Sequence, residues 1–199
     1  MSVAMPGLAA RLRNHAWLAQ AHVHDEGTVL VLNRAGIDAL CRLGKSGLVR
    51  TLALAESPDS VRLLDETQAA KGVDAAALLR QPLPREPILV AEHDADDTRV
   101  TELRVPLDLA HFPGHFAAAP VVPGAVQIAW ALELAASRLG TSVRCHTMEA
   151  LKFQQLLRPG APVTLTLLAD RPRGKLYFAY RDGDANYSSG RLIWSTAHE

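Results

Sequence analysis

The sequence predicts an α+β protein in which an antiparallel sheet wraps around one apolar helix, preceded by a small α+β unit. Three observations support this. The segment from Gln81 to Pro87 holds three prolines, which remove backbone donors and disfavour helix, so it is typical of a linker. The run from Pro123 to Leu139 has almost no charge before Glu133, so we expect both faces of this helix to be covered. Strand candidates separated by turns lie on either side of that run.

The length of the chain permits two parts. Domains usually hold roughly 100 to 200 residues, so 199 residues suit one large unit or a main domain with a smaller partner. We expect a small α+β unit at residues 1–80, the proline-rich linker at residues 81–87 and the larger domain at residues 88–199.

The first unit alternates short strands and helices, and Asp74 is placed to cap its last helix. The predicted strands are Thr28–Leu32 and Val61–Leu64, and the predicted helices are Arg34–Leu43, Ser46–Ala55 and Ala75–Arg80.

In the larger domain, Pro123 and Gly124 begin the apolar helix and Gly140 ends it. The predicted turns are Asp94–Asp97, Asp170–Gly174 and Asp182–Asp184. The predicted strands are Ile88–Glu92, Arg99–Val105, Cys145–Phe153, Val163–Ala169, Lys175–Arg181 and Gly190–Thr196.

Composition excludes several classes of function. The 21 basic and 21 acidic residues cancel, so no overall field favours nucleic acid or an anionic membrane. Cys41 and Cys145 lie far apart and give neither a disulfide framework nor metal-ligand spacing, so no metal site is expected. Charged residues interrupt the first 23 positions, which excludes a signal peptide, and no run approaches the ~20 apolar residues of a membrane span. We therefore expect a cytoplasmic protein.

The candidate chemistry lies between His111 and Trp130. An unperturbed imidazole titrates near ~6.5, so His115 can act as a base at neutral pH. The amino end of the following helix offers unpaired N–H groups and a positive dipole end to a developing enolate oxygen. Gly124 has no Cβ, so a ligand can approach the backbone closely there.

Two sequence blocks carry a resemblance to a known family. They are His111-Phe-Pro-Gly-His115-Phe116 with Pro120-Val-Val-Pro123-Gly124-Ala-Val-Gln127, and Leu151-Lys152-Phe153 with Leu157-Arg158-Pro159-Gly160. In order and separation they resemble the hot-dog-fold 3-hydroxyacyl-(acyl carrier protein) dehydratases, over about residues 87–196. The sequence around Trp130 is most similar to the dehydratases of aryl-polyene and related pigment lipid clusters.

This resemblance implies that His115 moves the C2 proton of the substrate and that the Gly124 N–H polarises the thioester carbonyl. Phe116, Val122, Trp130 and Phe153 are either core residues or lining of the acyl tunnel. No metal or redox cofactor is implied, because the substrate brings its own phosphopantetheine. The implied partners are acyl carrier protein and a second hot-dog subunit, in a homodimer or a heterodimer.

One departure from the family concerns the general acid. The family's carboxylate, which protonates the leaving hydroxyl, falls fourteen residues after the histidine, and here that position is Ala129. General acid catalysis contributes ~10²- to 10⁴-fold in rate, so an active enzyme needs a replacement. The candidates are Glu133, about one turn further along the helix, His111, and a carboxylate from a partner subunit, which we favour.

The first unit carries a weaker resemblance, from Val29 to Leu78, to the C-terminal subdomain of adenylate-forming acyl-CoA synthetases. Lys71 would match the adenylation lysine of that family, but the usual glycine before it is Ala70. The family's large ATP-binding domain has no counterpart in the sequence. We therefore expect a remnant with a structural or docking role.

The resemblance as a whole implies dehydration of 3-hydroxyacyl thioesters on acyl carrier protein to trans-2-enoyl thioesters, in fatty-acid or polyene pigment lipid synthesis. Two alternatives stay open. One is a non-catalytic hot-dog subunit that supports an active dehydratase, and the other is an acyl thioesterase that uses Gln127 or Glu133. The basic cluster of Arg171, Arg173 and Lys175 is either a solvated hairpin or a contact for the acidic carrier protein.

Overall fold

A computed structural model describes residues 6–95 and 97–194 of the protein. These residues form two compact units. Unit 1 holds the described residues up to Arg85 together with Pro106–Val121 and Arg158–Gly160, and unit 2 holds Glu86–Val105, Val122–Leu157 and the described residues from Ala161 onward. Chain order alone does not give this division, because the segment with His111 and His115 belongs to unit 1.

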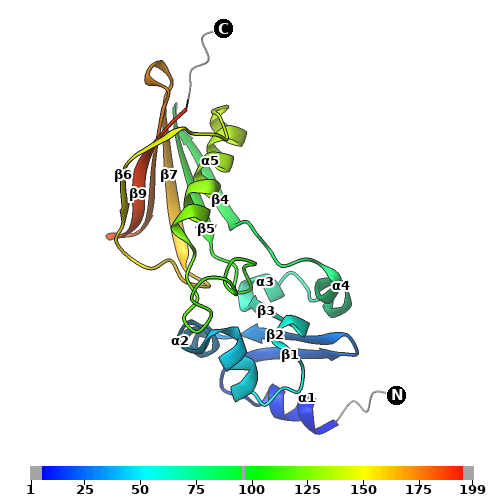
Figure 1. Ribbon diagram of the computed structural model, residues 1–199. Helices are drawn as coiled ribbons and strands as arrows, with labels where there is room; N and C mark the ends of the chain where they lie inside the picture. The colour runs from blue at the N-terminus through cyan, green and yellow to red at the C-terminus, as the bar shows by residue number, and fades with distance from the viewer. Residues whose placement is uncertain (1–5, 96, 195–199) are drawn as a thin grey trace. The chain divides into compact units, whose positions relative to one another are not determined.

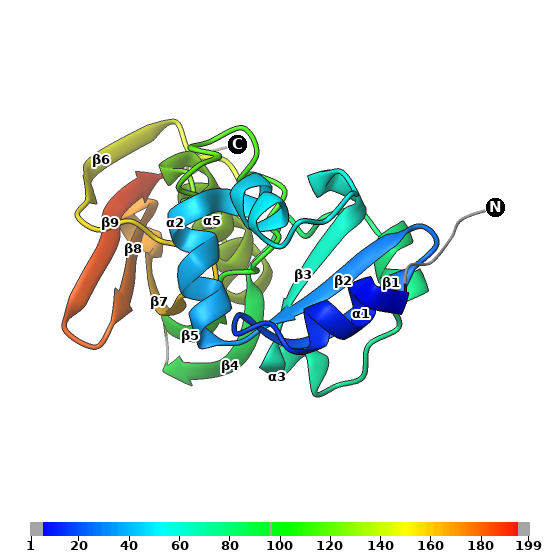
Figure 2. The same ribbon diagram turned by 90° about the horizontal axis from the view of Figure 1, so that it is seen from below.

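Unit 1 contains a three-stranded sheet and several helices. Its strands are β1 (Leu18–His24), β2 (Gly27–Leu32) and β3 (Val61–Asp65). Its helices are α1 (Pro6–Arg13), α2 (Arg34–Thr51), the 3₁₀ helix η1 (Pro58–Ser60), α3 (Glu66–Ala69) and α4 (Ala75–Arg80). β1 pairs antiparallel with β2, and β2 pairs parallel with β3. α1 lies against β1 (Figure 2).

Four elements of unit 1, α1, β1, η1 and α3, are absent from the sequence-based prediction. β1 is exposed or half-buried after its first residue, so its pairing with the fully buried β2, rather than its own pattern, defines it as a strand. α2 joins the predicted helix Arg34–Leu43 to the first part of the predicted helix Ser46–Ala55, ending at Thr51, and it breaks at Gly44, whose φ of 66° is non-helical. The Asn33 side chain caps α2 by accepting a bond from the Gly36 amide over 3.0 Å.

Unit 2 contains a six-stranded antiparallel sheet and one long helix (Figure 1). Its strands are β4 (Ile88–Ala95), β5 (Thr98–Arg104), β6 (Thr147–Phe153), β7 (Pro162–Asp170), β8 (Lys175–Asp182) and β9 (Ala185–Ile193), and its helices are α5 (Gly124–Leu139) and the 3₁₀ helix η2 (Arg171–Arg173). The strand order is β4-β5-β7-β8-β9-β6, so β4 and β6 are the two edges. Every pairing between these strands is antiparallel.

The helix α5 packs against β5 and β7. Buried and less buried residues alternate along β7 and β8, because successive side chains of a strand point to opposite faces of the sheet. The buried side chains of α5 are Gln127, Ile128, Trp130, Ala131, Leu132, Ala135 and Leu139. A sheet around one largely apolar helix is the hot-dog arrangement that the sequence predicts.

The expectation that both faces of α5 are covered is wrong for the single chain. Ala125, Glu133, Ser137 and Arg138 are exposed on it. Within unit 2, α5 packs against β5 and β7, and a single sheet can cover only one side of a helix.

The remaining differences lie at strand ends. β6 begins at Thr147 and not at Cys145, and β9 begins at Ala185 and not at Gly190. The predicted end of that last strand, Thr196, lies outside the described residues. Element boundaries are the least certain part of a pattern-based prediction, since a strand extends as far as its neighbour offers backbone partners.

The core of unit 1 includes one residue from the later part of the chain, Leu107, which is 2% exposed. The other buried members are Leu12, Leu18, Leu30, Leu32, Ala39, Leu40, Leu48, Val49, Leu52, Val61 and Leu63.

None of the helices in the described part of the chain is long and apolar enough to cross a membrane.

Candidate functional site

The amino end of α5 in unit 2 holds the sequence-predicted Gly124. Pro123 is the N-cap residue, and no side chain caps this end by a hydrogen bond. The first helical bonds run from the Val126 and Gln127 amides to the Pro123 oxygen, over 3.0 and 3.1 Å. The amides of Gly124 and Ala125 precede these bonds, so they are the ones that a helix terminus offers to an external acceptor.

Gly124 and Phe153 lie side by side in unit 2. A Cβ built on Gly124 would lie 2.7 Å from both Cε1 and Cζ of the Phe153 ring. The Phe153 side chain is 49% exposed, so this ring stands at the surface of the isolated chain beside the first turn of α5. Glycine therefore leaves room for the ring at this position.

Gln127 is buried in a network of hydrogen bonds within unit 2. Its Nε2 donates to the Val122 oxygen over 3.0 Å, and its Oε1 accepts from the Ser188 hydroxyl over 2.6 Å. The Tyr180 hydroxyl donates to the Gln127 backbone oxygen over 2.8 Å. These bonds fix the first turn of α5 to β8 and β9. Both amide atoms of the Gln127 side chain have protein partners, which argues against Gln127 as a residue that positions water.

Burial, and secondarily the negative charge of Glu133, raise the pKa of the Tyr180 phenol far above its ordinary value. Tyr180 therefore stays a neutral hydrogen-bond donor throughout the physiological pH range. Sequence reasoning missed Tyr180 and Ser188. The alternation of Leu176, Phe178 and Tyr180 along β8 places Tyr180 on the buried face, and that pattern is the signal that could have found it.

Val122, just before the first turn of α5, and Trp130, just after it, are both buried. The Val122 amide donates to the Leu157 oxygen over 2.8 Å, and the Val122 side chain is 3% exposed. Trp130, also 3% exposed, lines a cavity of about 390 Å³ in unit 2. That cavity is further lined by Glu86, Pro87, Leu89, Leu103, Glu133, Leu134, Ser137 and Arg138. Trp130 and Glu133 thus share a cavity that includes neither Gly124 nor Phe153.

Ala129 is half-buried on α5, and the nearest carboxylate along the helix is that of Glu133, which is exposed. About 6 Å of helix rise separates the two positions. The helix therefore offers no carboxylate at position 129, where the resemblance expects one.

The histidine segment, Pro106–Val121, belongs to unit 1 and holds the sequence-predicted His111 and His115. His115 is half-buried, and its ring packs edge-on against Phe116 with 4.6 Å between ring centroids. The His115 amide donates to the Phe112 oxygen over 3.1 Å, which closes a turn within the segment. His111 is half-buried as well.

Phe116 has a strained backbone. Its φ is 54°, in the left-handed region that side chains other than Asn and Asp rarely adopt, and its side chain is 67% exposed. The Ala119 amide donates to the Phe116 oxygen over 2.7 Å and holds this turn. Such strain costs about 1–3 kcal/mol and often accompanies functional loops, here one that presents an aromatic ring to solvent.

The basic cluster is not a free patch. Arg171 pairs with Asp97 over 3.7 Å, Arg173 with Asp170 over 3.3 Å, and Lys175 with Glu149 over 3.6 Å. The Arg171 guanidinium also donates to the backbone oxygen of Leu139. Local partners thus balance these charges, which weakens the case for a carrier-protein contact at this hairpin.

Lys71 is exposed in the turn after α3. Within residues 6–95 and 97–194, no group of three or more His, Cys, Asp or Glu side chains is arranged to hold a metal ion.

Comparison with known proteins identifies the family. Residues 91–191, about half of the chain, match the family model described as ApeI-like, ApeI dehydratase. The chain is 25% identical over 124 residues to 3-hydroxyacyl-(acyl-carrier-protein) dehydratase FabZ of Rhizobium etli, covering 57% of this chain and 80% of that protein.

One solved structure agrees with this family. The chain resembles the dehydratase heterocomplex ApeI:P from Xenorhabdus doucetiae at 28% identity and a TM-score of 0.50, covering 54% of this chain and 96% of that one. An uncharacterized protein from Erwinia carotovora subsp. atroseptica is 31% identical with a TM-score of 0.48, over 57% of this chain and 98% of that one. The sheet, its apolar helix and the matched segment together show that the chain belongs to the ApeI-like family of hot-dog dehydratases.

Proposed function

We propose that the protein dehydrates 3-hydroxyacyl thioesters carried on acyl carrier protein, giving trans-2-enoyl thioesters for fatty-acid or polyene pigment lipids. His115 takes the proton from C2, the Gly124 N–H donates to the thioester carbonyl, and the C3 hydroxyl leaves as water. The reaction changes no oxidation state, so it requires no redox cofactor. Free thiols at Cys41 and Cys145 suit a reducing cytoplasm.

The observation that carries this proposal is the uncapped amino end of α5 in a chain of the dehydratase family. Negative charge develops on the carbonyl oxygen as the C2 proton leaves, and a helix N-terminus stabilises such charge with N–H groups that are already oriented. The half-buried His115 precedes Gly124 by nine positions and supplies the base.

The leaving hydroxyl needs a proton, and we propose that a carboxylate of a partner subunit provides it. Position 129 is alanine, and the exposed Glu133 shares a cavity with Trp130, not with the residues at the amino end of α5. The similar solved structure from Xenorhabdus doucetiae is a dehydratase heterocomplex, which supports a partner of the same fold. His111 is the remaining candidate within the chain.

The edge strand β6 is the surface that we propose for this partner. It pairs on one side with β9, and it is exposed or half-buried along its whole length. Met148 is 50% exposed, Phe153 49% and Leu156, just beyond the strand, 58%. An open edge with exposed apolar side chains is a template for strand pairing by another chain. A partner on β6 would also cover Phe153 and so approach the amino end of α5.

The test compares the full-length chain alone with the chain co-purified with a hot-dog dehydratase subunit that has its own helix glutamate. The substrate is 3-hydroxydecanoyl-acyl carrier protein, and the enoyl product is measured. We expect little activity from the chain alone and full activity from the assembly. His115→Asn should lower the activity of the assembly by about 10²- to 10⁴-fold.

Two results would contradict this proposal. An ordinary rate from the chain alone that Glu133→Ala leaves unchanged would exclude both the partner and Glu133 as the acid. An assembly in which His115→Asn has no effect would identify the chain as the non-catalytic supporting subunit, the alternative that Ala129 favours. Acyl thioesterase activity is disfavoured because the Gln127 side chain has two protein partners, and Glu133 lines a cavity that includes neither Gly124 nor Phe153.

A further inference from the structure

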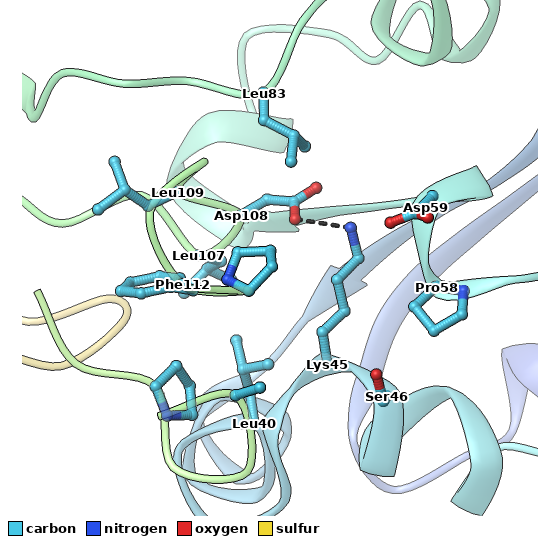
Figure 3. A pocket seen from close by; sticks show the side chains of 13 residues that line it. Leu40, Lys45, Ser46, Pro58, Asp59, Leu83, Leu107, Asp108, Leu109 and Phe112 are labelled. Carbon is cyan, nitrogen blue, oxygen red and sulfur yellow. Dashed lines mark hydrogen bonds and ion pairs between the residues drawn. The ribbon is translucent and has the colours of Figure 1, made fainter. Parts of the chain in front are cut away.

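Asp108 is a buried carboxylate that two cations share. It lies in the histidine segment and is 6% exposed. Lys45 Nζ lies 2.7 Å from Oδ1, and Arg62 Nε lies 3.4 Å from Oδ2. The Leu63 amide adds a weaker bond to Oδ2 over 3.3 Å. Figure 3 shows Lys45 reaching toward Asp108 at the edge of a cavity of about 160 Å³.

The two cations come from the N-terminal part of unit 1. Lys45 lies in α2 and Arg62 in β3. Arg62 also donates to the backbone oxygens of Gln81 and Pro82, over 2.6 and 3.3 Å. One carboxylate of the histidine segment is therefore tied to a helix, a strand and the proline-rich stretch.

Further contacts hold the same segment on both sides of His115. The Ala110 amide donates to the Pro84 oxygen over 2.8 Å, and Leu107 is part of the unit 1 core. A Cβ on Gly44 would lie 1.8 Å from the Ala117 oxygen, so the break in α2 makes room for the chain just after His115. The segment is thus fixed before and after the histidine by residues outside the hot-dog unit.

A buried ion pair is weak evidence for a stabilising role. Desolvation of the charges offsets much of their attraction, and apolar replacements of buried ion pairs are often neutral or stabilising. In some proteins a buried charged group with several partners instead fixes one conformation. A catalytic base needs a defined geometry, because a misplacement of about 1 Å can lower a rate by about 10²-fold.

We propose that Lys45, Arg62 and Asp108 are positioning residues for His115. They tie the histidine segment to the N-terminal part of unit 1, which thereby holds the base of the dehydration reaction in place. This inference rests on the proposed function for its catalytic consequence, and it gives the first 85 residues a role in the reaction.

The test uses the full-length chain, in its assembly with the hot-dog partner where activity requires one, and 3-hydroxydecanoyl-acyl carrier protein. Lys45→Met keeps the length of the side chain and removes the charge, and Asp108→Asn keeps the shape and removes the charge. We expect kcat to fall about 10- to 100-fold with KM within about twofold. Lys45→Arg should restore most of kcat, because it keeps a cation in reach of Asp108.

The matched control is Arg80→Met. Arg80 forms an ion pair with Glu26 over 3.0 Å in the same unit, and neither residue lies in the histidine segment. Its loss should leave kcat unchanged. A fall in kcat equal to that of Lys45→Met would show a general effect of lost charge and would overturn the proposal.

Hydrogen exchange separates this proposal from the proposed function. In Lys45→Met and Asp108→Asn, we expect amides of residues 106–121 to exchange faster while those of β2 stay protected. If exchange there is unchanged, the positioning role is wrong, whatever the activity. If exchange rises but the wild-type assembly shows no dehydration, the cluster still positions the segment and the proposed function is wrong. If both variants unfold, the cluster is a stability element and the positioning role is overturned.

Discussion

The Phe153 ring occupies the space where a side chain at Gly124 would begin, with 2.7 Å between the built Cβ and ring atom Cε1. Any residue larger than glycine must displace this ring or the first turn of α5. Because this ring is half exposed and can turn aside, Gly124→Ala should destabilise unit 2 by at most about 1 kcal/mol, the low end of overpacking. Thermal unfolding measures this change.

The double variant Gly124→Ala with Phe153→Ala separates packing from chemistry. Removing the ring relieves the clash, so we expect stability above that of Gly124→Ala alone. We expect activity to stay low, because the new methyl group still stands beside the amide that contacts the carbonyl. Full recovery of kcat in the double variant would mean that Gly124 serves packing only.

Ala129→Glu should give the isolated chain an acid of its own. The side chain is half-buried on α5, and glutamate is a good helix former. We expect dehydration by the chain without a partner to rise by about 10²- to 10⁴-fold. Ala136→Glu is the matched control, since it places the same charge on a half-buried position two turns later and should not raise the rate.

Tyr180→Phe should change how stability depends on high pH. Burial raises the pKa of Tyr180 in the folded state, while the unfolded phenol titrates near ~10. Below that pH both states keep the proton, and the contribution to stability is complete. Above it the unfolded state alone loses the proton, so stability falls by up to about 1.4 kcal/mol per pH unit. Urea unfolding at several pH values should show a shallower alkaline decline for Tyr180→Phe than for the wild type.

Ser188→Ala should destabilise unit 2 through the Gln127 side chain. Ser188 is 1% exposed, and its loss leaves Gln127 Oε1 buried without that donor. The expected cost is about 1–3 kcal/mol, measured by urea unfolding. Ser189→Ala is the matched control, because this half-buried neighbour lies on the opposite face of β9. Equal effects of the two variants would contradict the network.

The local sequence pattern was sufficient to predict most helices and strands of unit 2. The alternation along β7 and β8 and the apolar run of α5 predict these elements, because periodicity is a property of neighbouring residues. The same reasoning located Pro123 and Gly140 at the ends of α5, since proline and glycine restrict or free the backbone wherever they occur. It failed for β1, whose side chains show no regular alternation and are exposed or half-buried after the first residue.

The sequence by itself determined the hot-dog elements, the dehydratase-like histidine and glycine motif, and the absence of a carboxylate at Ala129. Only the tertiary structure decided that the histidine segment belongs to unit 1, and that Asp108 there meets Lys45 across 63 positions of sequence. It also decided that Gln127 is enclosed by Tyr180 and Ser188. The physical reason is that periodicity and turn chemistry act between neighbours, whereas burial of a charge or an amide depends on which distant residues supply its partners.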